Sequence, residues 1–130
     1  MSPDLFLIFN HHFTPTQEAD ARASLDVDRI VVMPDDIRRV WGNVPPDLPG
    51  IGEYLTPVRN WLSRNAEAGD YVLVQGDFGA TYLMVGFALE AGFLPVYSTT
   101  SREAVEEHQP DGSVRMTHRF RHVRFRQYGG

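Results

Sequence analysis

Three short segments carry groups suited to binding and cleaving a phosphodiester. Asn10-His11-His12 supplies an amide donor and an imidazole that can carry a proton near neutral pH. Gly76-Asp77-Phe78-Gly79 supplies backbone N–H groups, while Ser98-Thr99-Thr100-Ser101-Arg102 supplies hydroxyls and a guanidinium. Guanidinium groups pair well with phosphate oxygens. The three segments therefore suggest a site that holds a phosphodiester without a metal ion.

Each of these segments directly follows an apolar run that predicts a buried strand. The predicted strands are Leu5–Phe9, Tyr71–Gln75 and Phe93–Tyr97. In open α/β sheets, ligands bind where parallel strands end. We therefore expect the three polar segments to form loops along one edge of a sheet.

The glycine loop also lies at the start of a predicted helix, Ala80–Ala91, which Gly92 closes. Free N–H groups at a helix start can meet an anion. A purely structural interpretation of the loop is about equally well supported: the glycines only form a tight turn, and Asp77 only caps the helix. A carboxylate beside a phosphate is unfavourable, so Asp77 and Gln75 are better suited to a ribose hydroxyl or a base.

The other elements complete an alternating pattern of strands and helices. Thr14, Pro15 and Gln17 form a helix start, and an Asp-Gly pair marks a hairpin turn. The alternation changes phase in the last strand, which predicts a bulge near Arg121-His122. The further predicted elements are helix Pro15–Ser24, strand Arg29–Met33, helix Asp35–Trp41, a loop over 42–50, helix Glu53–Ala68, and hairpin strands Glu103–His108 and Ser113–Arg126. This order predicts one α/β domain over residues 1–130, Rossmann-like, with an open, mainly parallel sheet and a C-terminal antiparallel hairpin.

Composition narrows the class of protein. The chain has 130 residues, a formal net charge of −5, and neither cysteine nor lysine. A disulfide framework and thiolate metal sites are excluded, and a reducing cytoplasm suits such a chain. The apolar runs fall far short of the roughly 20 residues that span a bilayer, so we expect no membrane segment.

Standard cofactor and metal sites find little support. The sequence lacks a Gly-x-Ser-x-Gly elbow, a paired-glycine dinucleotide loop and a dense carboxylate cluster. His118 and His122 have a zinc-like spacing but no matching second pair, so we expect neither a metal nor another cofactor. Five arginines after Gly112 could meet nucleic acid, but a charged edge strand that resists aggregation is the slightly stronger interpretation. We expect no long nucleic acid as a partner.

The chain resembles a small CRISPR-associated family, the member numbered twenty of the Csx group, found among the accessory proteins of type III systems. The resemblance runs nearly end to end and depends mainly on the string Gly-Asp-Tyr-Val-Leu-Val-Gln-Gly-Asp-Phe-Gly-Ala-Thr-Tyr at 69–82. Supporting segments are Leu-Phe-Leu-Ile-Phe-Asn-His at 5–11, Trp-Gly-Asn-Val-Pro-Pro-Asp-Leu at 41–48 and Pro-Val-Tyr-Ser-Thr-Thr-Ser-Arg at 95–102.

The resemblance implies a fold like that of the CRISPR-associated Rossmann (CARF) sensor domains, usually dimeric. It also implies ring nuclease activity, which degrades cyclic oligoadenylate and so ends an antiviral signal. Among the rings, we expect cyclic tetra-adenylate. From the residues themselves we assign alignment and proton transfer to Asn10 and His11, backbone donation to Gly76 and Gly79, and phosphate contacts to Ser98, Thr99, Thr100 and Arg102. Two other functions stay open. One is a binding protein that holds the ring without cutting it, as a sensor or sponge, or that binds a nucleotide to regulate a partner; the other is a nucleic-acid module that uses the arginines.

Overall fold

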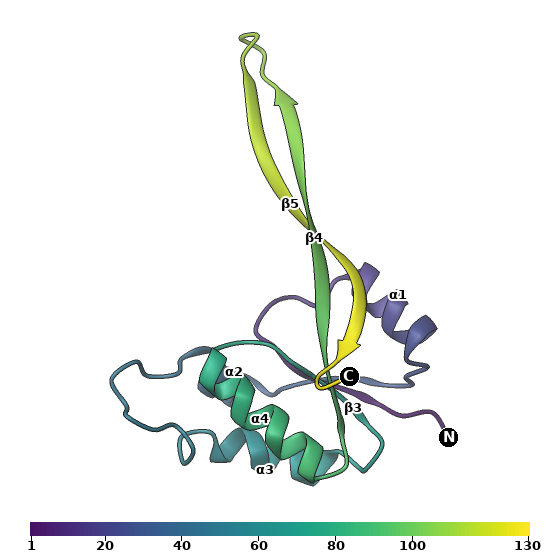
Figure 1. Cartoon of the computed structure of the whole chain (residues 1–130), viewed down its shortest axis with the longest axis vertical. Helices are drawn as coiled ribbons and strands as arrows, with labels where there is room; N and C mark the ends of the chain where they lie inside the picture. Colours follow the sequence, from purple (N-terminus) through teal and green to yellow (C-terminus); the bar gives the residue numbers. More distant parts are fainter.

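The computed structural model describes all residues from 1 to 130 and contains one five-stranded sheet with four helices (Figure 1). The strands are β1 (Leu5–Ile8), β2 (Ile30–Val32), β3 (Tyr71–Val74), β4 (Leu94–His108) and β5 (Val114–Gln127). The helices are α1 (Pro15–Ser24), α2 (Asp35–Gly42), α3 (Thr56–Asn65) and α4 (Phe78–Glu90). None of the four has the length and apolar character needed to span a membrane.

The sheet is mixed and mostly parallel, in the order β2-β1-β3-β4-β5. β1 pairs in parallel with β2 and β3, β3 pairs in parallel with β4, and only β4 and β5 are antiparallel. The central strands are buried on both faces, which explains their continuous apolar sequences. The α/β class, the mainly parallel sheet and the C-terminal hairpin are thus confirmed.

Two apolar clusters hold helices on the two faces of the sheet. The larger joins side chains of α2, α3 and α4 to one face, with Phe6, Trp41 and Met84 among its buried members. The smaller joins α1 to the other face through Ala21 and Phe125. The carboxyl ends of β1 and β3 therefore lie between the helices on the two faces of the sheet.

The starts of α1 and α4 follow their local sequences. Thr14 and Gln17 form a reciprocal capping box at α1, as the sequence predicts. Asp77 caps α4 by accepting a hydrogen bond from the N–H of Ala80 at 3.0 Å. α4 begins at Phe78, two residues before the predicted start, so Phe78 and Gly79 belong to its first turn. The amphipathic helix predicted over Glu53–Ala68 is shorter, Thr56–Asn65.

The largest departure from the sequence prediction lies in β4. Residues 98–102 were expected to form a loop after a strand over 93–97, but β4 continues through them to His108. Thr99 is held by β5, because its Oγ1 accepts from the N–H of Arg124 at 3.1 Å and donates to the Arg124 carbonyl at 3.0 Å. The paired strands then leave the body as a long twisted ribbon (Figure 1).

The register of this ribbon shifts once. Thr99 pairs with Arg124 and Thr100 with His122, so Val123 is the extra residue of a bulge. The bulge lies one residue from the predicted position. The phase change in the β5 sequence was therefore a correct signal.

Candidate functional site

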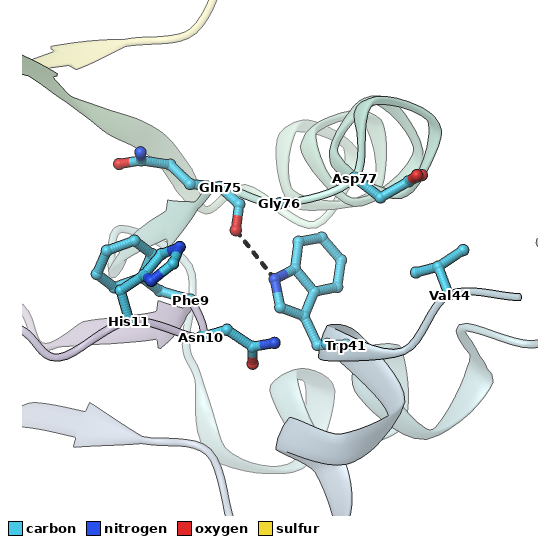
Figure 2. A pocket seen from close by; sticks show the side chains of 9 residues that line it. Phe9, Asn10, His11, Trp41, Val44, Gln75, Gly76 and Asp77 are labelled. Atoms are coloured by element: carbon cyan, nitrogen blue, oxygen red, sulfur yellow. Dashed lines mark hydrogen bonds between the residues drawn. The ribbon is translucent and has the colours of Figure 1, made fainter. Parts of the chain in front are cut away.

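A hollow of about 530 Å³ lies where β1 and β3 end, beside the end of α2 (Figure 2). Three segments line it: Phe9, Asn10 and His11 after β1, Trp41, Gly42 and Val44 around the end of α2, and Gln75, Gly76 and Asp77 between β3 and α4. The first and third of these segments were predicted to meet at this edge of the sheet, and the structure brings them together.

Trp41 fixes the loop after β3. Its indole Nε1 donates to the Gln75 carbonyl at 3.0 Å (Figure 2). Trp41 is 2% exposed. Gly76 lies directly against the ring, because a Cβ at that position would be 2.8 Å from Nε1 and 2.9 Å from two ring carbons. The close approach of backbone to indole explains a glycine here and sets the position of the loop.

Four successive backbone N–H groups, those of residues 76–79, donate to no protein acceptor. The N–H of Gln75 before them donates to Ile8, and that of Ala80 after them donates to the Asp77 side chain. These free donors lie at the N-terminal end of α4, where the helix dipole favours negative charge. The loop can thus bind an anion, although Asp77 also has the capping role of the purely structural interpretation.

The side chain of Asn10 is less available to a ligand than its sequence position suggests, because two backbone groups hold its amide. With its amide oriented to satisfy both neighbours, its nitrogen donates to the Arg38 carbonyl at 3.3 Å and its oxygen accepts from the Gly42 N–H at 3.2 Å. A Cβ at Gly42 would overlap this amide, at 1.9 Å from the nitrogen. Asn10 therefore joins the end of β1 to the end of α2, and one amide N–H is left for a ligand.

His11 is exposed and lines both this hollow and a second one beside it. Its ring contacts Phe9 edge to face, with centroids 5.4 Å apart, and hydrogen-bonds to no protein group. His12 is exposed as well, and it lines the second hollow but not the first.

The second hollow, about 430 Å³, is lined by two arginines, Arg22 and Arg38, that no sequence pattern indicates as site residues. Arg38 lines it together with His11, and its Nη2 lies 3.5 Å from the Asn10 carbonyl. Arg38 belongs to a predicted helix with charges of both signs, and this pattern does not indicate a site residue. The contact becomes visible only once α2 is placed against the end of β1.

The predicted phosphate contacts of residues 98–102 do not reach the main hollow. Ser98 is 8% exposed on the α1 side of the sheet, and Thr99 is engaged with β5. Thr100 lines a separate hollow near the start of α1, and Arg102 lies on the ribbon opposite Phe120. They miss the hollow because β4 continues through them: Thr99 points to the face opposite Ser98, and each later residue lies farther out along the strand.

Ser98 instead belongs to a chain of polar contacts. Its Oγ is 2.5 Å from Nδ1 of His122, whose Nε2 is 2.6 Å from Oδ2 of Asp20. Hydrogen bonds from Ser24, which has the larger effect, and from His122 lower the pKa of Asp20 below its ordinary value. The Ser98 N–H also donates to Gln75 Oε1 at 2.8 Å, so this chain orients the Gln75 side chain and leaves its amide N–H groups unused.

Both nitrogens of His122 are occupied, which removes it from a metal site with His118.

The arginines of the hairpin are not a free cationic strip. Arg115 and Arg119 lie directly opposite Glu107 and Glu103, and Arg121 is 3.8 Å from a Glu103 carboxylate oxygen. Partial neutralisation across the strands weakens the case for nucleic-acid binding and supports the edge-strand interpretation.

The fold and the site together define an α/β protein with a loop of free backbone N–H groups at the carboxyl edge of a mixed sheet. The chain belongs to the family described as "Uncharacterized protein MJ1673 family", whose model matches residues 3–126. It is 44% identical to the protein MJ1673 of Methanocaldococcus jannaschii over 126 residues, which are 97% of both chains. No solved structure gives a significant match.

Proposed function

We propose that the protein is a ring nuclease that degrades a cyclic oligoadenylate, with cyclic tetra-adenylate as the first candidate. The observation that carries the proposal is the set of four free N–H groups of residues 76–79, next to the hollow that Asn10 and His11 also line. Backbone donors at a helix start suit a phosphodiester, and an imidazole beside them suits proton transfer. The Csx resemblance and a CARF-like form of the fold are part of the same proposal.

Residues around the loop account for the rest of the ligand. Arg38 adds a guanidinium next to Asn10, which suits a further phosphate of the ring. Gln75 offers its free amide N–H groups and Asp77 its unused Oδ1 to base or ribose. Phe78 is 96% exposed at the start of α4 and offers its ring face for stacking on an adenine.

The reaction needs no metal ion because the substrate carries its own nucleophile. A ribose 2′-oxygen attacks the adjacent phosphorus in line, the bond to the 5′-oxygen breaks, and the products are a cyclic 2′,3′-phosphate and a 5′-hydroxyl. His11 moves a proton from the 2′-hydroxyl or to the leaving 5′-oxygen, and the loop N–H groups stabilise the charge on the non-bridging oxygens. Acting in the cytoplasm, the enzyme would end a type III CRISPR signal.

We further propose that two chains share one ring in a symmetric homodimer. A single hollow with one nearby guanidinium offers few donors to a ring that carries several phosphates. A two-fold axis would present each loop twice. The outer face of α4 is available for such a contact, since Phe78, Tyr82 and Leu89 are exposed along it.

A non-catalytic sensor or sponge is the second candidate, and one observation favours it. His11 is held by no hydrogen bond and Asn10 is tied to α2, whereas catalytic acids and bases are usually oriented by a neighbour. A pocket of this kind could bind the ring and leave it intact.

Paired binding and single-turnover measurements on variants separate the two candidates. For a ring nuclease, His11→Ala slows single-turnover cleavage by about 10²- to 10⁴-fold and changes binding much less. Arg38→Ala, the matched control for the neighbouring charge, mainly weakens binding. If His11→Ala cleaves at the wild-type rate, imidazole catalysis is wrong. If the wild-type protein binds the ring and releases only intact ring, the sensor is the correct function.

A further inference from the structure

The ribbon of β4 and β5 extends beyond the helices with nothing packed on its outer part (Figure 1). Eight residue pairs, from Ser101–Arg121 to His108–Val114, lie past the Thr100–His122 pair. A two-stranded hairpin alone is only marginally stable in water. A ribbon of this length therefore calls for a partner surface.

The two faces of the ribbon differ in character. One, here named the open face, consists of side chains that are all exposed: Arg102, Ala104, Glu106, His108, Val114, Met116, His118 and Phe120. Val114, Met116 and Phe120 are 50%, 54% and 71% exposed, which makes an apolar stripe along β5. The other face carries the glutamate and arginine side chains that oppose one another across the strands. Apolar side chains thus gather on the face that lacks cover.

We propose that the open face packs against the open face of a second copy of this chain, with the two ribbons antiparallel. The inference is independent of the proposed function. A two-fold axis at the Ala104–His118 pair sets Arg102 opposite the partner's Glu106 and Phe120 opposite the partner's Met116. At the axis, Ala104 and His118 each face the same residue of the partner. The face is therefore complementary to itself in both charge and apolar character.

The same register places the hairpin tip against a basic hollow. The His108–Val114 pair comes opposite the partner's Thr100–His122 pair, so the turn beyond it reaches the hollow of about 580 Å³ at the start of α1. Arg119 and Arg121 line that hollow, together with one carboxylate, that of Glu103. The tip carries the carboxylate of Asp111, and hydrogen bonds from Ser113 hold its pKa below the ordinary value. The one carboxylate of the tip thus comes near two arginines that share a single glutamate, Glu103.

The contact involves the eight exposed side chains of the open face and the turn at the tip of each chain. Partners in an interface of standard size each bury about 800 Å². The bodies lie at opposite ends of the paired ribbons, so this contact leaves the α4 faces free. If the ring-sharing contact also forms, the assembly contains four chains.

Chemical cross-linking tests the position of the two-fold axis. The chain has no cysteine, so each introduced thiol is unique. Ala104→Cys should give a covalent dimer with a short bis-maleimide at low protein concentration. Val105→Cys, the control on the opposite face, should give little. Equal yields from both variants, or none from Ala104→Cys, would overturn the proposal.

Light scattering tests the chemistry of the face. Met116→Lys should halve the mass of the assembly, whereas Thr117→Lys, its neighbour on the opposite face, should leave it unchanged. Arg102→Glu should also halve it, and the double variant Arg102→Glu with Glu106→Arg should restore it, because the exchange recreates the opposite charges. A wild-type protein that stays monomeric at its highest soluble concentration contradicts the pairing. So does a double variant that is not restored. Ring cleavage, measured separately, does not bear on these results.

Discussion

Replacing Gly76 by alanine tests whether Trp41 positions the loop after β3. The new methyl group would lie 2.8–2.9 Å from three atoms of the indole, against about 3.5–4.0 Å for a favourable contact. Trp41 is 2% exposed, and its indole cannot move aside without disturbing its hydrogen bond to Gln75. Overpacking costs about 1–3 kcal/mol and a strained buried hydrogen bond adds about 1 kcal/mol, so we expect a loss of about 2–4 kcal/mol.

Urea unfolding followed by tryptophan fluorescence measures this loss, with Gly79→Ala as the matched control. A Cβ at Gly79 meets only Asp77 at 3.5 Å and Ile51 at 3.6 Å, which are ordinary contacts. Because alanine favours a helix, the control should be neutral or up to about 1 kcal/mol more stable. Ring binding should fall in Gly76→Ala and persist in Gly79→Ala. A Gly76→Ala protein as stable as the wild type would refute the role assigned to Trp41.

The remaining predictions concern charges. Arg38→Ala should weaken ring binding, measured by calorimetry, by about 10- to 100-fold, because a charged hydrogen bond is lost. Arg102→Ala should leave the affinity unchanged. Equal effects of the two substitutions would contradict the placement of these residues. Asp20→Asn should destabilise the protein at pH 7, because the lowered pKa of Asp20 means that its ionised form stabilises the fold. This stabilisation is fully present above the pKa of Asp20 in the unfolded chain, about 3.8, and is lost as the pH falls through the lower pKa in the folded protein. The variant should therefore approach the stability of the wild type in unfolding experiments at pH 3. A difference in stability that stays constant with pH would be evidence against the contact with His122.

Local sequence signals predicted the elements near the site well. Thr14, Pro15 and Gln17 specify the start of α1, and the apolar runs before Asn10 and Gly76 specify two buried parallel strands. These signals are carried by residues next to one another in the chain. The meeting of the loops at 9–11 and 75–77 then follows from the general rule for parallel sheets.

The rest of the site depends on contacts between distant residues. Trp41 lies 34 positions before Gln75, and its pattern in α2 indicates only a buried side chain. The segment from Ser98 to Arg102 reads as a polar loop, yet it forms a strand because β5 supplies its hydrogen bonds. The placement of Arg38 beside Asn10 likewise requires the packing of α2 against β1. No local pattern contains this information.

Multiple-turnover cleavage of labelled cyclic tri-, tetra- and hexa-adenylate in the presence of EDTA tests the central claim most directly. The account predicts that the protein converts a molar excess of at least one ring into linear products ending in a cyclic 2′,3′-phosphate, at a rate that the chelator does not change. Binding without product, or cleavage that stops with EDTA and returns with manganese, would contradict it.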